Sequence, residues 1–230
     1  MKNNIYLICF SLFSIISCNK SNPTYSNLAS VNIVNGMVNS SPILPSFGTT
    51  KNYSQAENIY FGGYYDYALN PGNNVTTIVQ GTDTSQTVFT GTLSLSPNSI
   101  YSLFLTGMNN TADTILTHDQ LPQHSGLDSV IGLRFINCSP GSNPFSINLQ
   151  GSMTNLVNSL GYKQITTFQT IPGSGYNPSF TLEVRDAVSD SLLTTFNGSG
   201  VLYKNQTIVI SGIDSANAAV PLTVFAVNHY

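Results

Sequence analysis

The sequence has few charged side chains, and this shortage excludes several classes of protein. Lys and Arg number 7 and Asp and Glu number 10, which is 7% of 230 residues and a net charge of −3. Average soluble chains carry about 25% charged residues. Binding to nucleic acid requires clustered Lys and Arg, so we expect no nucleic-acid partner. An acidic tail and a coiled coil also need many charges and are excluded with it.

Cysteine is scarce as well, and Trp is absent. Of the 3 cysteines, Cys9 and Cys18 lie close to the N-terminus, which leaves Cys138 without an intramolecular disulfide partner. We expect Cys138 to be a small buried hydrophobic residue. Stability must then come from an apolar core, and 41% hydrophobic residues with 12 Tyr and 12 Phe are enough to build one and to exclude disorder.

The N-terminus has the pattern of a secretory signal. Lys2 precedes an apolar stretch over Ile5–Ile16 that is too short to span a bilayer, which takes about 20 apolar residues. This stretch ends in Ile15-Ile16-Ser17-Cys18, which resembles a bacterial lipobox. The resemblance implies cleavage before Cys18 and lipidation of that cysteine, for example with palmitate. We predict a lipoprotein signal peptide over 1–17 and a polar tether over 18–27; the alternative is an ordinary signal peptide that contains Cys.

Four short blocks recur in the same order at nearly constant spacing, which predicts a duplicated domain of about 100 residues. The offsets between equivalent blocks lie between 101 and 105 residues. The pairs are Val31–Asn35 with Leu133–Asn137, Asn70–Gly72 with Ile171–Gly173, Val75–Val79 with Phe180–Val184, and Ser99–Gly107 with Lys204–Gly212.

Both repeats have the pattern of β-strands. Apolar and polar residues alternate over Val31–Val34, Thr92–Leu95 and Phe180–Val184, as in half-buried strands. The runs Tyr101–Leu105 and Thr207–Ile210 are short and rich in β-branched or aromatic residues, as in core strands. Gly, Pro and Asn clusters between the runs predict turns.

Several short strands separated by turns favour a β-sandwich. We predict an all-β chain with two tandem antiparallel β-sandwiches, repeat 1 over 28–116 and repeat 2 over 130–230. The polar segment 117–129 is the expected linker. Thr154–Leu160 is the one stretch that could hold a helical turn.

Repeat 2 opens on Gly132–Ser142 and then Phe145–Leu149, a block that resembles the opening signature of domain-of-unknown-function family 4397. Pro172-Gly173 before Phe180–Val184 resembles a later block of the same family, and both features recur in weaker form in repeat 1. The resemblance implies tandem immunoglobulin-like sandwiches in a lipid-anchored protein, commonly of the Bacteroidota, and it implies no catalytic residues.

Enzyme signatures are absent from the sequence. It has no Gly-x-Ser-x-Gly elbow, no His-Glu-x-x-His motif and no phosphate-binding loop. His118, Asp119 and His124 have suggestive spacing, but a third strong zinc ligand is hard to name, so we interpret the histidines as solvated linker residues. We expect no catalytic site, no metal and no cofactor.

The densest aromatic run is Tyr60–Tyr67. Aromatic faces beside Asn, Asp and Gln bind neutral sugars, so Tyr60, Tyr64, Tyr65 and Tyr67 are candidate ligand-binding residues. The alternative is a strand with alternate aromatic side chains in the core.

Four Asp residues are followed by Ser or Thr and then an aliphatic residue. The pattern resembles the O-glycosylation sequon that this bacterial group uses on exported proteins; the alternative is ordinary turn chemistry. The candidate acceptors are Thr114, Ser129, Ser191 and Ser215.

The sequence therefore predicts a lipid-anchored protein of the outer membrane, on the cell surface or the periplasmic face. Two non-catalytic roles remain open. The first is binding of a glycan or nutrient, or of an envelope protein. The second is a structural or adhesive spacer with no small-molecule ligand.

Overall fold

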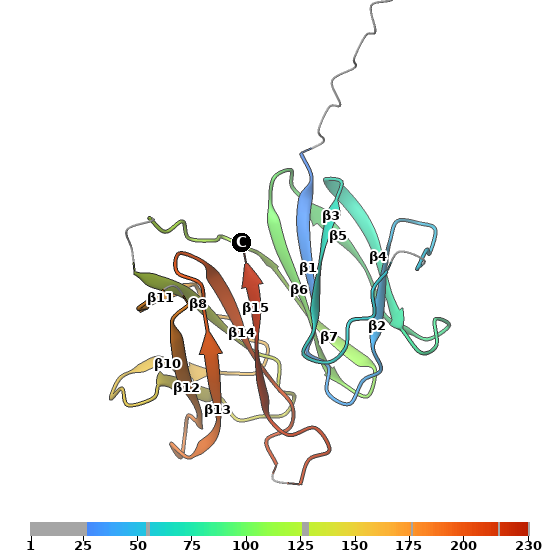
Figure 1. Ribbon diagram of the computed structural model, residues 1–230. Coiled ribbons are helices and arrows are strands. Elements are labelled where there is room, and N and C mark those ends of the chain that lie inside the picture. The colour runs from blue at the N-terminus through green and yellow to red at the C-terminus, as the bar shows by residue number, and fades with distance from the viewer. Residues whose placement is uncertain (1–26, 54–55, 126–128, 176, 216, 230) are drawn as a thin grey trace, which may run out of the picture.

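A computed structural model describes residues 27–53, 56–125, 129–175, 177–215 and 217–229. These residues form 15 strands in four sheets and no helix, as predicted for an all-β chain (Figure 1). Accordingly, the described part of the chain has no helix that could cross a membrane. Cys18 and the predicted signal peptide lie outside the described residues.

The first half of the chain forms two sheets. One has the strand order β3-β1-β6-β7, and the other has the order β2-β4-β5. The strands are β1 (Ala29–Asn35), β2 (Ile43–Phe47), β3 (Tyr64–Leu69), β4 (Gly72–Gln80), β5 (Thr87–Leu95), β6 (Ile100–Met108) and β7 (Thr111–His118).

The second half repeats this arrangement with one more strand. The sheet β11-β8-β14-β15 corresponds to β3-β1-β6-β7, and β10-β9-β12-β13 corresponds to β2-β4-β5. The strands are β8 (Val130–Asn137), β9 (Phe145–Leu149), β10 (Asn155–Leu160), β11 (Gln169–Pro172), β12 (Ser179–Asp186), β13 (Leu192–Ser199), β14 (Asn205–Ser211) and β15 (Thr223–His229).

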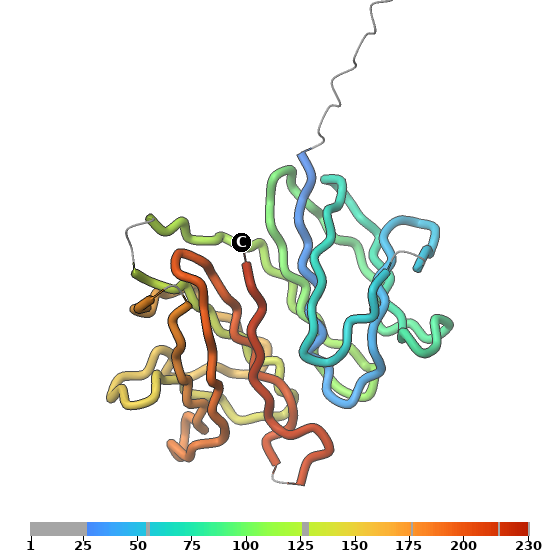
Figure 2. The backbone as a smooth tube through the Cα atoms, in the orientation of Figure 1, coloured from blue at the N-terminus to red at the C-terminus, as the bar shows by residue number. Residues whose placement is uncertain are grey.

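Strand pairing matches the repeated blocks residue by residue. Val31 pairs with Tyr101 in the first half, and Leu133 pairs with Gln206 in the second. Val31 and Leu133 are 102 residues apart in the sequence, and Tyr101 and Gln206 are 105 residues apart. These are the same offsets that relate the repeated blocks. The two halves therefore share one topology, and the backbone passes from one to the other after β7 (Figure 2).

Three details differ from the expectation. The sheets β3-β1-β6-β7 and β11-β8-β14-β15, which we call the inner sheets, each contain one parallel pair, β1 with β6 and β8 with β14. The chain crosses to the other sheet between the paired strands, so the expected wholly antiparallel arrangement is wrong there. The stretch Thr154–Leu160 contains strand β10 and no helical turn, since it pairs with β9. Strand β7 reaches His118, two residues into the segment expected to be a linker.

Each half has its own core between its two sheets. Alternate side chains of β1 and β6 pack against β2, β4 and β5. The equivalent side chains of β8 and β14 pack against β9, β10 and β12. Ile33, Leu103, Phe135 and Ile208 are examples, and each is at most 1% exposed. The alternation in Thr92–Leu95 is observed as predicted, with Leu93 and Leu95 buried.

The opposite face of each inner sheet is also buried, because the two inner sheets pack against each other. We call this contact the seam. Its apolar part is a cluster of six buried residues with four half-buried neighbours. The buried residues are Val34, Phe104, Ile136, Cys138, Val209 and Val227, and the neighbours are Tyr64, Ile115, Ile165 and Phe225. The sheets thus stack in four layers (Figure 1).

The seam is self-complementary. Thr106 of β6 donates a 2.6 Å hydrogen bond to the carbonyl oxygen of Cys138, and its equivalent Ser211 of β14 donates one of 2.6 Å to the carbonyl oxygen of Gly36. Gly36 and Cys138 are themselves equivalent and touch, because a Cβ on Gly36 would lie 3.3 Å from the Cβ of Cys138. The halves are therefore related by an approximate twofold axis that passes near this pair, as in an isologous dimer.

We expect the seam to couple the unfolding of the two halves. Phe104 is fully buried, so Phe104→Ala should lower the free energy of unfolding by about 3–5 kcal/mol. Urea unfolding followed by tyrosine fluorescence and by circular dichroism should give coincident transitions for the wild type. The matched change Phe89→Ala, at a half-buried ring outside the seam, should cost less. Two separate transitions, or equal losses for both variants, would contradict this.

Candidate functional site

The aromatic run Tyr60–Tyr67 does not form one platform. Tyr60 is 64% exposed and lies before β3, whereas Tyr64 points into the seam. Tyr65 and Tyr67 lie on the other face of β3 with ring centroids 5.0 Å apart, and Tyr67 lies 5.0 Å from Phe47 at the edge of the first core. Alternation along a strand separates Tyr64 from Tyr65, as the alternative interpretation of this run expected.

Burial also limits what Tyr67 can offer a ligand. Its hydroxyl is buried and has no hydrogen-bond partner in the described part of the protein. Burial, with smaller contributions from Tyr65 and Glu57, raises the pKa of Tyr67 to about 12. Tyr65 is 44% exposed and is the one member of this pair that presents its ring to solvent.

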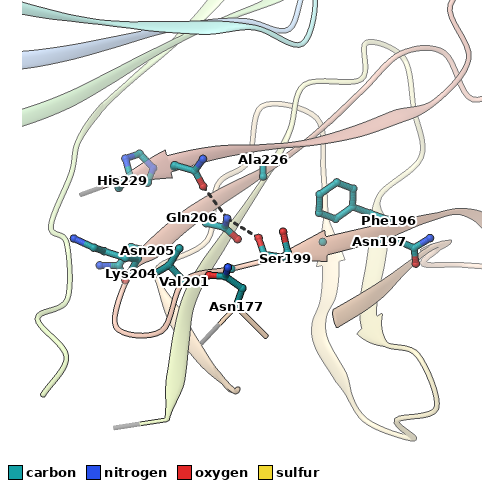
Figure 3. Close-up of a pocket in the computed structure, with 13 residues that line it drawn as sticks. Asn177, Phe196, Asn197, Ser199, Val201, Lys204, Asn205, Gln206, Ala226 and His229 are labelled. Atoms are coloured by element: carbon teal, nitrogen blue, oxygen red, sulfur yellow. Dashed lines mark hydrogen bonds between the residues drawn. The ribbon is translucent and has the colours of Figure 1, made fainter. Parts of the chain in front are cut away.

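A cleft of about 550 Å³ lies in the second half, along the open edge where β13 faces the β14–β15 hairpin (Figure 3). We call it the β13–β15 cleft. Most of its polar lining consists of side-chain amides, and Lys204 is the one Lys, Arg, Asp or Glu among the residues that line it. The amide residues are Asn177, Asn197, Asn205, Gln206 and Asn228.

Gln206 lies at the centre of the cleft and holds a fixed orientation. Its Nε2 donates to the carbonyl oxygen of Ser199 at 3.1 Å and to Oδ1 of Asn228 at 2.7 Å (Figure 3). Its Oε1 is buried and has no partner among the described residues. An unpaired buried acceptor costs about 1–3 kcal/mol, and a donor that reached Oε1 would remove this cost.

Tyr64 contributes to this cleft from the other half of the chain. Its hydroxyl oxygen accepts from the backbone N–H of Asn228 at 3.4 Å and from Nδ2 of the same residue at 3.3 Å. Asn228 in turn accepts from Gln206, so a chain of hydrogen bonds runs from Tyr64 through Asn228 to Gln206. Of the four predicted tyrosines, Tyr64 is therefore the one tied to the cleft, as a positioning residue.

The far end of the cleft is apolar. Phe196 lines it, with its ring centroid 6.4 Å from that of Phe180. Gly198 lies beside both rings, and a Cβ there would come within 2.8 Å of each. A glycine at this position therefore lets the rings approach the strand.

A polar network crosses the seam next to the cleft. The Arg134 guanidinium donates to Asp119 at 2.7 Å, to Thr207 at 2.7 Å and to Ser102 at 3.3 Å. Its central carbon lies 4.8 Å from the ring centroid of Phe168. Asp119, which belongs to the expected linker, is thus buried in an ion pair.

His229 completes this network as a neutral ring. The hydroxyl oxygen of Thr207 accepts from Arg134 and lies 2.6 Å from Nε2 of His229. Burial, reinforced by the Arg134 guanidinium and opposed by Asp119, lowers the pKa of His229 from 6.5 to about 4. The ring therefore stays uncharged at neutral pH.

The remaining sequence candidates lie apart from the cleft. Ser129, Ser191 and Ser215 are exposed outside the strands, whereas Thr114 is half-buried within β7. Asp113, which precedes Thr114, is engaged by Lys163 at 3.1 Å. Three of the four candidate acceptors are thus open to modification in the folded chain.

The histidines and the cysteine have structural surroundings. The ring centroid of His118 lies 4.8 Å from that of Tyr101 in a stacked arrangement, and a ring nitrogen of His124 lies 3.0 Å from Oδ1 of Asn205. The described residues hold no group of three or more His, Cys, Asp or Glu placed to bind a metal. Cys138 is buried as predicted, and burial raises the pKa of its thiol to about 12.

Sequence reasoning missed the cleft. Gln206 and Asn228 lie in strands whose polar residues resemble the many other Asn and Gln of this chain. One signal was available, because Gln206 occupies the position that Tyr101 has in the first repeat.

The depressed pKa of His229 predicts a loss of stability in mild acid. Between about pH 6.5 and pH 4 the unfolded chain binds a proton at this site and the folded chain does not, so stability falls as the pH is lowered through this window. The slope should approach about 1.4 kcal/mol per pH unit from this group. Urea unfolding across the window should show a shallower slope for His229→Gln than for the wild type. Equal slopes for His229→Gln and wild type would refute the assignment.

No protein-family model and no curated protein matches the chain. Its membership of domain-of-unknown-function family 4397 therefore stays a prediction.

Three solved structures show a distant likeness. A family CBM26 module from Eubacterium rectale Amy13K, solved in complex with maltoheptaose, is 10% identical with a TM-score of 0.27, over 86% of this chain and 96% of that one. The Bacillus anthracis TIE protein is 12% identical with a TM-score of 0.27, over 81% of this chain and 33% of its own length. A candidate cell adhesion protein from Bacteroides ovatus is 11% identical with a TM-score of 0.21, over 86% and 95%. At these scores the likeness carries no argument about function.

Proposed function

We propose that the protein is a non-catalytic binding protein that holds a neutral carbohydrate in the β13–β15 cleft. The observation that carries this proposal is the buried, unpartnered Oε1 of Gln206 in a cleft lined by amides. A sugar hydroxyl donates to such an oxygen and accepts from a neighbouring amide N–H, so one ligand type satisfies both kinds of group.

The rest of the cleft suits the same ligand. A volume of about 550 Å³ lies within the range of small-molecule sites, about 300–1,000 Å³. Phe196 offers an apolar surface to the C–H face of a sugar ring. The low charge of the lining favours a neutral ligand over an anionic one, with Lys204 at the margin.

The cleft assigns distinct roles to three side chains. Gln206→Ala removes the acceptor, and Phe196→Ala removes the apolar surface, so each should weaken carbohydrate binding at least tenfold, which corresponds to about 1.4 kcal/mol. Tyr64→Phe keeps the ring and removes the hydroxyl that holds Asn228, so it should weaken binding by a smaller factor. A glycan array identifies the ligand, and calorimetry measures each variant.

Asn73→Ala is the matched control, because this exposed amide in β4 lies far from the cleft and contacts Ser94. It should bind like the wild type. An array without a hit, or a hit whose affinity is unchanged in Gln206→Ala, contradicts the proposal.

We further propose that this binding protein is exported and anchored through a lipidated Cys18 in the outer membrane, facing the cell surface or the periplasm. The support is the Ile15-Ile16-Ser17-Cys18 motif after a basic and apolar start. Two or more acyl chains would hold the protein stably, since each buried CH₂ contributes about 0.8 kcal/mol. The four-layer fold is consistent with tandem immunoglobulin-like sandwiches, and the exposed Ser129, Ser191 and Ser215 are proposed sugar acceptors.

Cys18→Ser should abolish the anchor without affecting the fold. Cells fed an alkyne analogue of palmitate should label the wild type, and the label should be absent from Cys18→Ser, which should move from the membrane to the soluble fraction. Cys138→Ser is the control and should keep the label, because its buried thiol is not exposed to acylation. A labelled Cys18→Ser would refute the assignment.

A structural or adhesive spacer is the second candidate function. The observation that favours it is the seam, because two halves packed through a buried apolar cluster form a unit of fixed shape. This role predicts that deleting the gene alters adhesion or envelope integrity and leaves carbohydrate uptake unchanged. Protease shaving of intact cells would show which face of the membrane the chain occupies.

A further inference from the structure

A second cavity, of about 290 Å³, lies in the seam beside the β13–β15 cleft. We call it the seam cavity. It shares Asn228 and His229 with the cleft, and its remaining wall comes from the first half of the chain and the segment after β7. These residues are Ser30, Asn32, Asp66, Ile100 and Leu121.

The approximate twofold axis relates this cavity to the surroundings of Arg134. Asn32 of β1 is the equivalent of Arg134 of β8, by the offset of 102 that aligns their strands. Asp66, which pairs with Asn32 across β1 and β3, takes the place of Phe168, the ring beside the Arg134 guanidinium. Tyr101 pairs with His118 of β7, and the equivalent Gln206 pairs with Asn228 of β15. Asp119 and His229 each follow that partner by one residue, so His229 is the equivalent of Asp119.

One half of the seam thus contains a guanidinium, and the other half contains a cavity at the equivalent place. In the filled half, Asp119, Thr207 and Ser102 accept all the hydrogen bonds recorded for Arg134. In the other half, the short Asn32 side chain does not reach into the space that an arginine would occupy.

Two residues on the walls of the seam cavity present acceptors, Asn32 and Asp66. Asn32 is 2% exposed, its Nδ2 donates to Asp66 at 2.7 Å, and its Oδ1 has no partner among the described residues. Because the amide nitrogen donates to a carboxylate, the orientation of this side chain is determined, and Oδ1 is the acceptor left without a partner in the described part of the chain. Partial burial raises the pKa of the Asp66 carboxyl, and the hydrogen bond from Asn32 opposes this shift.

The charges around the seam cavity favour a cation. Arg134 is neutralised by Asp119 in a 2.7 Å ion pair, and His229 is uncharged at neutral pH because burial lowers its pKa to about 4. Lys204 lines the neighbouring cleft and is not among the residues of the seam cavity. Asp66, which is exposed, is therefore the one charged side chain among the residues that line the seam cavity.

We propose that the seam cavity binds a guanidinium group through Asn32 Oδ1 and the Asp66 carboxylate, as an unlinked counterpart of the Arg134 side chain. A planar guanidinium has five N–H donors and no acceptor, which suits walls that supply a carboxylate and an amide oxygen. The group belongs to a free small molecule or to the arginine side chain of a partner, and the two sources present the same chemistry.

Replacing Asn32 by arginine tests the proposal within the chain itself. Asn32→Arg should place a tethered guanidinium in the seam cavity and raise Tm by about 2–4 °C relative to Asn32→Met, which has similar length and no charge. Adding Asp66→Asn to Asn32→Arg should remove this gain. If Asn32→Arg melts at or below Asn32→Met, the cavity does not accept a guanidinium and the proposal fails.

Titration of the wild-type protein tests binding without relying on the fold of a variant. Methylguanidinium and N-acetyl-arginine amide represent the two sources, and N-acetyl-citrulline amide is the neutral control of the same shape. At constant ionic strength, the cations should shift the Asn32 side-chain amide resonances in the millimolar range, and the citrulline compound should not. Binding of the blocked arginine alone indicates a peptide partner, and binding of both cations indicates a site open to free molecules.

Asp66→Asn should weaken the binding of both cations at least tenfold, and Asp113→Asn, at an exposed ion pair in β7, should leave it unchanged. Equal shifts with the citrulline compound, or no shifts in the millimolar range, would overturn the proposal. Neither Asn32 nor Asp66 lines the β13–β15 cleft, so this outcome is independent of carbohydrate binding.

Discussion

Contact between the two inner sheets is the constraint on which the rest of the structure depends. Phe104, Val34 and Ile136 are fully buried by this contact and would be exposed on separated halves. A separate half would therefore present an apolar patch on its main sheet, which isolated soluble domains avoid. The chain solves this by duplicating one sandwich-like unit and packing the two copies face to face through the same surface, as a homodimer does.

Burial on both faces explains why the inner strands carry so few charges. Arg134 is 4% exposed and pairs with Asp119, and such an ion pair costs desolvation energy that its attraction only partly returns. Removal of one partner would leave an unpaired buried charge, at a cost of about 3–5 kcal/mol. The network therefore specifies how the halves meet more than it stabilises them, and it holds His229 neutral at the rim of both cavities.

Departures from the twofold symmetry produce the two cavities that we propose as ligand sites. In the first half Tyr101 fills its position and accepts from the backbone of Ser96, whereas the equivalent Gln206 leaves an acceptor free in the β13–β15 cleft. Arg134 fills its side of the seam, and the equivalent Asn32 leaves the seam cavity. A duplicated chain can keep one copy for packing and change the other for binding, because the packing contacts of the seam are distributed over both.

Repeated blocks and strand periodicity in the sequence were sufficient to predict an all-β chain built twice on one pattern, since alternation and turn residues act locally. The cysteine count separately predicted a buried Cys138. The parallel pairs and the four-layer stack followed only from the tertiary structure. Strand alternation says that a residue is buried or exposed on one face, but it does not say what covers the other face. Because Gln206, Asn228 and Tyr64 come from segments up to 164 residues apart, their meeting in one cleft is decided by how the two halves pack.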